Sequence, residues 1–258
     1  TGIYKKTVVL EEQWLQKDTI LKFHGVDSAF DVWVNGTHVG FSKVSRLPSE
    51  FEITDFVKCG ENDITVRVYK WSDGTYLEDQ DMWWLSGIYR DVELINEEKN
   101  AILDLQVNGT LDDSYRDGIF TAKITMKQAG TSFKWKLSDK GEVVLEEKLT
   151  SETKEACIEA KLPEVYKWTA ETPNLYDFTV ESATQEVTVR CGFRRIEIKD
   201  KNFRVNNQVI LLNGVNHHDY NPKEGRVITR ELMEADIRLM KQYNINAVRC
   251  SHYPANEY

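Results

Sequence analysis

Long apolar runs are absent from this sequence, and so are the usual marks of membrane insertion or export. No stretch approaches the ~18 consecutive apolar residues of a transmembrane helix. The opening TGIYKK lacks the basic-then-apolar order of a signal peptide, and it lacks an initiator Met. We therefore expect no membrane partner, and we expect the chain to begin inside a longer protein.

Basic residues are too few to balance the acidic ones. Lys and Arg number 33 against 42 Asp and Glu, which gives a net charge of −9. Nucleic acids and anionic lipid surfaces attract basic patches, so this balance argues against both as partners. At about 100–200 residues per domain, the 258 residues suggest two domains and a further piece.

Cysteine is scarce, and its spacing carries no motif. The four cysteines are Cys59, Cys157, Cys191 and Cys250. They form neither a CxxC pair nor a metal-finger pattern, so we expect a reduced, cytoplasmic setting. Asn35 and Asn108 each begin an Asn-Gly-Thr sequon, and we interpret both Asn-Gly pairs as turns.

Short strands with turn signals between them fill the first 97 residues. FDVWVNGTHVGFS alternates on both sides of Asn35-Gly36, which predicts a two-residue hairpin with Phe30, Val32 and Val34 on one face. Further strands are predicted in EFEITDFV, NDITVRVYKW and YRDVELI. This pattern is typical of a β-sandwich or jelly roll, which we assign to residues 1–97.

A second strand-rich region follows the polar, charged segment NEEKN at 96–100. About seven short strands are predicted between residues 101 and 194, which fits an immunoglobulin-like sandwich. We place this second domain at residues 98–194.

The pattern changes again after residue 194. A hairpin is predicted about Asn206-Asn207, and VILLNGVNHHDY then reads as a buried strand that runs into a polar loop. TRELMEADIRLMKQY has helical spacing with Thr229 as its N-cap, and INAVRCSHY is another buried strand. Strand, helix and strand form a βαβ unit, which cannot cover both faces of its strands alone. We therefore expect residues 195–258 to be the first part of a larger parallel sheet.

Polar side chains follow both strands of this unit at their carboxyl ends. The first strand runs into His217, His218 and Asp219, and the second contains Arg249 and runs into His252. In (β/α)₈ barrels the catalytic loops lie at this end of the strands, so the cluster is a candidate site. Two alternatives remain: the histidines only cap the strand, or they bind a metal, although no HxxxH or HxH spacing is present.

One stretch combines acids and aromatics in a way that suits neither a core strand nor a solvated loop. WSDGTYLEDQDMWWLSGIYRDV, residues 71–92, holds five acids, three Trp and two Tyr. Carboxylates accept hydrogen bonds from sugar hydroxyls, and aromatic faces cover the apolar side of a pyranose. Glu78, Asp79 and Asp81 are therefore candidates for sugar recognition. The alternative is a solvated turn whose tryptophans are buried in the core or an interface.

No catalytic carboxylate pair can be assigned from spacing alone. A retaining glycosidase needs two carboxyl groups ~5–5.5 Å apart, and the spacing of the three acids at 78–81 does not indicate such a pair. Glu257 is a further candidate, because it lies in an Asn-Glu dipeptide. It also lies at an expected helix start, where an acid is favoured by the helix dipole, and we prefer that interpretation.

Several blocks of the sequence closely resemble β-galactosidases of glycoside hydrolase family 2. The blocks are GVDSAFDVWVNGTHVGFSKVSRLPSEFEITDF, GEN, WSDGTYLEDQDMWWLSGIYRDVEL, WTAETPNLY, GFRRIEI, LLNGVNHHD and LMKQYNINAVRCSHYP. Together they span nearly the whole chain, as an N-terminal and central fragment of such an enzyme. The resemblance implies a mostly β fold. Its order is a jelly-roll sugar-binding-like β-sandwich, an immunoglobulin-like β-sandwich and the truncated start of a (β/α)₈ TIM barrel.

The resemblance also implies roles for four residues. Asp81 matches a family acid that contacts galactose hydroxyls and a sodium ion, and His218 matches a histidine that contacts the sugar. Arg249 and His252 match a pair in which the His binds a galactose hydroxyl and the Arg positions active-site carboxylates. The family's acid/base and nucleophilic glutamates, like its magnesium-binding acids, are expected beyond Tyr258.

We therefore expect the chain to be part of a retaining β-galactosidase that hydrolyses terminal β-galactosides such as lactose, and to be inactive alone. The whole enzyme is expected to use sodium and magnesium, and to act as a homo-oligomer or with a complementing chain. One alternative is a non-catalytic carbohydrate-binding protein of two sandwiches, which would have no use for the first quarter of a barrel. The other is a β-glucuronidase of the same family, which the acidic LEDQD loop disfavours.

Overall fold

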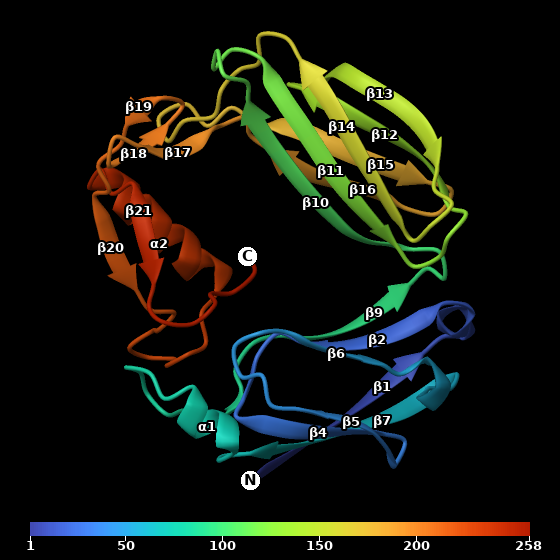
Figure 1. Ribbon diagram of the computed structural model, residues 1–258. Helices are drawn as coiled ribbons and strands as arrows, with labels where there is room; N and C mark the ends of the chain where they lie inside the picture. Colours follow the sequence, from blue (N-terminus) through green and yellow to red (C-terminus); the bar gives the residue numbers. More distant parts are fainter. The chain divides into compact units, whose positions relative to one another are not determined.

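The computed structural model describes all 258 residues, and Figure 1 shows their strands and helices. Strands dominate, and two short 3₁₀ helices and two α-helices complete the elements. The chain divides into two compact units, of which the first contains residues 1–97 and 213–258 and the second contains residues 98–212. The mostly β fold expected from the sequence is confirmed. No helix is both long enough and apolar enough to cross a membrane.

Residues 1–97 form a β-sandwich. Its strands are β1 (Gly2–Leu10), β2 (Asp18–Phe23), β3 (Val26–Asp27), β4 (Ala29–Val34), β5 (Thr37–Ser42), β6 (Ser49–Glu52), β7 (Gly60–Tyr69), β8 (Gly87–Ile88) and β9 (Val92–Glu97), with 3₁₀ helices η1 (Glu12–Gln16) and η2 (Thr54–Phe56). One sheet has the order β1-β7-β4-β5, a second has the order β6-β2-β9, and β3 pairs with β8. Side chains from both larger sheets make one apolar core, in which Phe23 and Phe30 pack with ring centroids 4.8 Å apart.

The predicted hairpin at Asn35-Gly36 is confirmed. β4 and β5 are antiparallel, and both turn residues have positive φ, 50° and 82°, as a two-residue hairpin turn of this hand requires. The predicted inward face is also correct, because Phe30, Val32 and Val34 are each fully buried. Period-two alternation therefore identified both the strand and the face that it buries.

Residues 101–194 contain a second sandwich. Its strands are β10 (Ile102–Leu111), β11 (Gly118–Met126), β12 (Ser132–Asp139), β13 (Glu142–Thr150), β14 (Glu155–Leu162), β15 (Tyr176–Ser182) and β16 (Glu186–Cys191). They form sheets of order β10-β11-β14 and β13-β12-β15-β16, the three-plus-four arrangement of an immunoglobulin-like domain. Phe120, Trp135 and Phe178 pack together in its core. A small sheet of β17 (Ile196–Lys199), β18 (Asn202–Val205) and β19 (Gln208–Val209) follows, and β18 and β19 flank the predicted Asn206-Asn207 turn.

The predicted βαβ unit is present at the end of the chain. β20 (Gly214–His217) and β21 (Ala247–Cys250) are parallel, and α2 (Arg230–Gln242) lies between them in the sequence. Thr229 caps α2, because its side chain accepts a hydrogen bond from the Leu232 amide. The expectation that both strands are buried is wrong. Their residues are exposed or half-buried, because the two four-residue strands pair only with each other.

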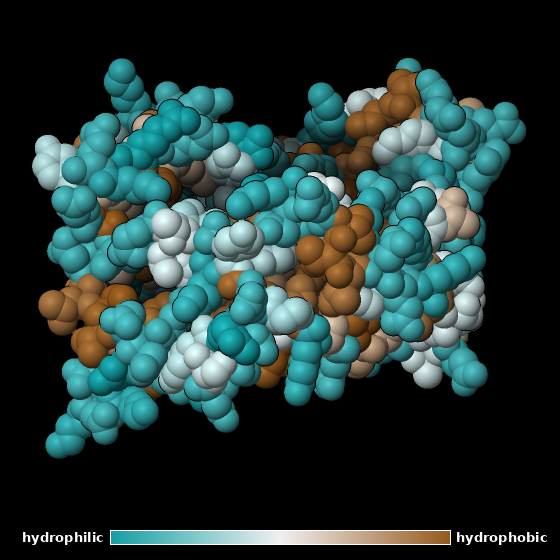
Figure 2. Space-filling model, turned by 90° about the horizontal axis from the view of Figure 1, so that it is seen from above, coloured by the Kyte–Doolittle hydropathy of each residue, from teal (hydrophilic) through white to brown (hydrophobic).

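A short helix lies near the start of the acidic, aromatic stretch of residues 71–92. α1 (Asp73–Leu77) begins after Ser72, whose amide donates to the Thr75 hydroxyl at 3.2 Å. The residues that follow, 78–86, contain no strand or helix, and they are called the Asp81 loop below. In Figure 2 most of the visible surface is hydrophilic, with apolar residues in separate patches.

Candidate functional site

The carboxyl ends of β20 and β21 lie side by side, as the sequence predicted. His217 pairs in register with Cys250, and the Ser251 amide donates to the His217 carbonyl at 2.9 Å. The next residues along each chain segment also meet, because the His218 and His252 rings are perpendicular with centroids 5.8 Å apart. Parallel pairing therefore brings two histidines from distant parts of the sequence to one edge.

A pocket of about 440 Å³ lies at this edge, within the ~300–1,000 Å³ range of small-molecule sites. It is called the Asp81 pocket below. Its lining residues come from the Asp81 loop and from the segments that follow β20 and β21. They are Asp81, Met82, Trp83, His218, Tyr220, Arg226 and Tyr253. Two of the predicted site residues, Asp81 and His218, thus line the same pocket although 137 positions separate them.

Aromatic side chains supply much of the wall of the Asp81 pocket. Trp83 and Tyr220 stack with centroids 6.5 Å apart and planes 21° apart, and Trp83 remains 68% exposed. Tyr253 lies beside His218, with ring centroids 5.9 Å apart. Burial, with a smaller effect of the nearby Asp219 carboxylate, raises the pKa of the Tyr253 hydroxyl. Tyr253 therefore stays neutral near pH 7, and the pocket combines one exposed carboxylate with flat apolar faces.

The other two predicted residues lie next to the pocket without lining it. The His252 ring packs against the ring of His218, which itself lines the pocket. Arg249 points at its neighbours, with Nη1 3.3 Å from the Ser251 hydroxyl and 3.5 Å from the Asn216 side-chain oxygen. The structure thus groups Asp81 with His218, places His252 behind His218, and leaves Arg249 at the strand end.

Three further sequence candidates make structural contacts. His217 Nε2 lies 2.9 Å from an Asp236 carboxylate oxygen, which ties β20 to α2. A carboxylate oxygen of Glu257 lies 3.3 Å from the Lys22 ammonium and 3.3 Å from a ring nitrogen of His24. Lys22 is on strand β2, and His24 follows that strand. Asp79 accepts a hydrogen bond from the indole of Trp84 at 3.1 Å. None of these three groups lines the Asp81 pocket.

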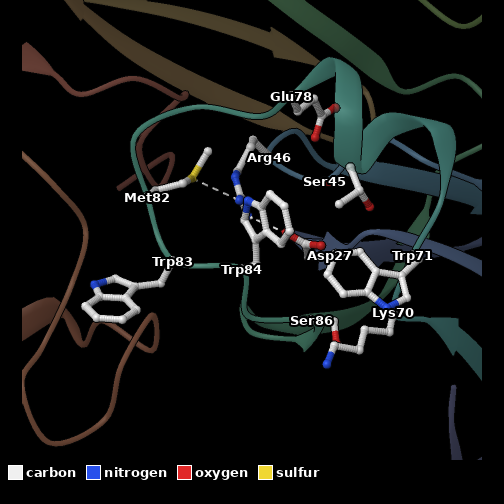
Figure 3. A pocket seen from close by; sticks show the side chains of 11 residues that line it. Asp27, Ser45, Arg46, Lys70, Trp71, Glu78, Met82, Trp83, Trp84 and Ser86 are labelled. Carbon is white, nitrogen blue, oxygen red and sulfur yellow. Dashed lines mark hydrogen bonds and ion pairs between the residues drawn. The ribbon is translucent and has the colours of Figure 1, made fainter.

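Sequence reasoning missed a set of buried charged side chains next to the pocket, of which Arg226 also lines it. One carboxylate oxygen of Asp27 accepts hydrogen bonds from Nη1 and Nη2 of Arg226, at 3.0 and 3.1 Å. The same oxygen lies 3.1 Å from Nη1 of Arg46. Figure 3 shows Arg46 between Asp27 and the sulfur of Met82, while Trp83 points away from this group. Burial raises the pKa of Asp27, although Arg46 acts in the opposite direction. No local pattern could identify Arg226 as the partner of Asp27, because 199 positions separate them.

Three family models match successive parts of the chain. "Glycosyl hydrolases family 2, sugar binding domain" matches residues 1–98, "Glycosyl hydrolases family 2" matches residues 92–194, and "Glycosyl hydrolases family 2, TIM barrel domain" matches residues 196–258. The chain belongs to glycoside hydrolase family 2. This membership confirms the recognition made from the sequence blocks and the order of folds that it implied.

Relatives of this family 2 chain include β-galactosidases from bacteria and yeast. The β-galactosidase of Photobacterium profundum is 41% identical over 272 residues, which cover 98% of this chain and 26% of that protein. The β-galactosidase of Kluyveromyces lactis is 40% identical, with coverage of 98% and 28%. The chain therefore spans about a quarter of the length of these relatives.

Solved structures with a similar fold include β-glucuronidases. An uncultured Clostridium β-glucuronidase aligns with a TM-score of 0.88 at 25% identity, over 99% of this chain and 45% of that one. A Bifidobacterium dentium β-glucuronidase complexed with coumarin-3-O-glucuronide aligns with a TM-score of 0.87 at 21% identity, over 99% and 49%. The second likeness establishes only that the fold is shared.

The family 2 resemblance implied a sodium ion at Asp81, and the residues present do not make a complete site for one. No group of three or more His, Cys, Asp or Glu side chains is arranged to hold a metal ion. Asp81 is the only carboxylate that lines its pocket, whereas hard cations take about six or more oxygen ligands. We therefore assign neither sodium nor magnesium to residues of this chain.

Proposed function

We propose that this chain is part of a retaining β-galactosidase, in which it supplies side chains that bind the non-reducing galactose. The observation that carries the proposal is the Asp81 pocket, which brings Asp81 and His218 together with stacked aromatic rings. The ~40% identity to β-galactosidases over nearly the whole chain supports the same substrate class.

Each wall of the pocket suits one part of a pyranose. The exposed Asp81 carboxylate accepts hydrogen bonds from sugar hydroxyls, and a hydrogen bond to a charged group contributes roughly 1.5–3 kcal/mol. His218 and the neutral Tyr253 hydroxyl lie on the segments that follow β20 and β21, and they offer further hydrogen-bond partners. Trp83 and Tyr220 provide flat faces for the apolar side of the ring. These groups bind and orient the sugar; they do not break its glycosidic bond.

We place the two catalytic carboxyl groups outside this chain. Retaining hydrolysis requires a nucleophile and an acid/base ~5–5.5 Å apart, and only one carboxylate lines the pocket. Asp27, an acid next to this pocket, is already paired with Arg46 and Arg226. The proposed division of labour is that this chain holds the substrate while carboxylates elsewhere in the enzyme form and hydrolyse the galactosyl intermediate.

β-Glucuronidase is the second candidate, because solved structures of similar fold carry that name. A glucuronide carries a carboxylate that needs a cation in its site. Arg226 is the only Lys or Arg that lines the Asp81 pocket, and both of its terminal nitrogens donate to Asp27. The exposed charge in the pocket is the negative one of Asp81, which favours an uncharged galactoside over a uronate.

Hydrolysis of nitrophenyl β-galactoside and nitrophenyl β-glucuronide tests this proposal. The assay compares the 258-residue chain with a version extended through a complete barrel. We expect only the extended protein to act, and only on the galactoside. Replacing Asp81 with Ala in the extended protein should lower kcat/KM by about 10–100-fold, which corresponds to the loss of hydrogen bonds to a charged group.

Asp104→Ala is the matched control, because Asp104 is an exposed acid on β10. This substitution should leave kcat/KM unchanged. Turnover by the short chain alone would refute the placement of the catalytic pair. Preference for the glucuronide would support the rival enzyme, and sugar binding without hydrolysis by the extended protein would support a binding module.

A further inference from the structure

The Asp81 loop has no regular structure of its own to fix the position of Asp81. Its internal hydrogen bonds are local, from the Met82 amide to the Gln80 carbonyl at 2.7 Å, from the Leu85 amide to the Trp83 carbonyl at 3.1 Å and from the Trp84 indole to the Asp79 carboxylate at 3.1 Å. Such short turns leave the loop many conformations, so its position depends on contacts from outside it. Trp83 stacks on Tyr220 and Trp84 packs edge-on against Trp71, and two arginines make the polar contacts described next.

Arg226 binds the end of the loop to the body of the first sandwich. Its Nη1 donates to the Leu85 carbonyl, and Nη1 and Nη2 donate to the Asp27 carboxylate at 3.0 and 3.1 Å. Its guanidinium lies 5.0 Å from the centre of the Tyr89 ring, and its side chain is only 8% exposed. A planar guanidinium can serve two acceptors in fixed directions, which a lysine cannot.

The segment that carries Arg226 is itself held in one shape. The Asn221 amide donates to the Gly225 carbonyl at 2.7 Å, and the Gly225 amide donates back to the Asn221 carbonyl at 2.8 Å. The Asn221 side chain also accepts from the Lys223 amide at 2.7 Å. Gly225 has a φ of 66°, which glycine adopts without strain. Arg226 therefore extends from a closed turn rather than from a loose loop.

Arg46 makes the corresponding contact within the loop. Its Nη2 lies 3.2 Å from the sulfur of Met82, and its Nη1 lies 3.1 Å from the same Asp27 oxygen that Arg226 contacts. Asp27 thus joins both arginines, and their two attachment points, Met82 and Leu85, follow Asp81 by one and four positions. Asp81 itself stays exposed in the pocket.

We propose that Arg226 is a positioning residue for substrate binding, which holds Asp81 in place by fixing Leu85 against Asp27. This inference rests on the proposed function, because it assigns Arg226 to the galactose site. Arg226 acts through the loop rather than on the sugar, since both of its terminal nitrogens already have acceptors within the protein. The same arrangement makes the bound position of Asp81 depend on residues of the barrel segment.

The first test replaces Arg226 with Met and with Lys in the protein extended through a complete barrel. Arg226→Met should raise KM for nitrophenyl β-galactoside about tenfold with a smaller effect on kcat, as expected for a displaced binding group. Arg226→Lys should give an intermediate KM. Asp27 keeps Arg46 as a partner, so neither variant leaves it unpaired. Arg238→Met is the control, because Arg238 is 73% exposed on α2.

A double-substitution cycle separates positioning from general structural support. If Arg226 acts through Asp81, then Arg226→Met should add little to the loss already caused by Asp81→Ala. Amide hydrogen exchange across residues 78–86 should also be faster in Arg226→Met than in Arg238→Met. If the extended wild-type protein hydrolyses no galactoside, the proposed function is wrong, and so is this inference. An active Arg226→Met enzyme with unchanged KM, or fully multiplicative effects with Asp81→Ala, overturns the positioning role alone.

Discussion

At the scale of single residues, Asp31 is a nearly buried carboxylate with three hydrogen-bond partners. Its carboxylate accepts hydrogen bonds from Tyr69 at 2.6 Å and from Arg67 and His38 at 2.9 Å each. Burial pushes its pKa up, but the three hydrogen bonds outweigh that effect and lower the pKa of Asp31 from 3.8 to about 2. A carboxylate with a lowered pKa stabilises the folded state only while it is ionised.

Asp31→Asn is expected to destabilise the first sandwich in a pH-dependent way. At pH 7 the loss should be about 2 kcal/mol in the free energy of unfolding, the equivalent of the shift in pKa. Because the native pKa lies below the unfolded one, this contribution is complete above pH ~4 and disappears as the pH falls from about 3.8 to 2. Urea unfolding between pH 7 and pH 2 measures it. A gap between wild type and variant that stays constant across this range would contradict the argument.

The alternation that puts Phe30, Val32 and Val34 on one face of β4 leaves Asp31 on the other, but it does not predict the environment of Asp31. The pattern assigns Asp31 to the outer face of β4, opposite the core residues, where a charged group is normally exposed. The structure leaves it only 8% exposed, because Arg67 and Tyr69 from the adjacent strand β7 and His38 from β5 cover it. Cross-strand neighbours depend on register, and the sequence of one strand does not contain that information.

At the scale of elements, α2 depends on its cap more than a buried helix would. The Thr229 hydroxyl accepts a hydrogen bond from the Leu232 amide at 3.4 Å, and no residue of α2 is buried. With little packing to stabilise it, loss of the cap should cost roughly 0.5–2 kcal/mol in Thr229→Ala, whereas Thr229→Ser should keep most of the stability. Urea unfolding of both variants measures the difference. Equal stabilities for Ala and Ser at this position would show that the hydroxyl contributes nothing.

Most elements with a strong local signal were predictable, and those fixed by tertiary contacts were not. The turn expected at Asn108-Gly109 is wrong, because both residues lie inside strand β10 and pair with β11. The Asn35-Gly36 hairpin and the Thr229 cap were both found from the sequence, since a turn or cap is set by neighbouring residues. Helix α1 was not, because five residues are too few for a recognisable period. Its Ser72 and Thr75 pair was the one available signal.

At the scale of the whole molecule, the candidate site was predictable only in its parts. Asp81 and His218 were each identified, but from separate blocks, and nothing in the local sequence places them around one pocket. The family resemblance supplied that connection. It did not supply Arg226 or Asp27, whose contact joins residues 199 positions apart. Long-range pairs of this kind follow from the docking of the barrel segment on the sandwich.

The two units should unfold as separate transitions, because each completes its own hydrophobic core. One core draws on residues between 8 and 94, the other on residues between 102 and 193, and no residue belongs to both. Phe30 and Phe178 are each fully buried in one of them. Replacing either with Ala should cost about 3–5 kcal/mol in its own unit and leave the other unchanged.

Differential scanning calorimetry of the two variants tests this independence, with Phe41→Ala as a control at a 53% exposed position of the first sandwich. Phe30→Ala should lower the midpoint of one transition, Phe178→Ala should lower that of the other, and Phe41→Ala should move neither appreciably. A single transition lowered by both core substitutions would mean that the two cores unfold together. In that case a destabilising change in the immunoglobulin-like sandwich would also loosen the Asp81 pocket, and the effect on sugar binding would no longer be local to the first unit.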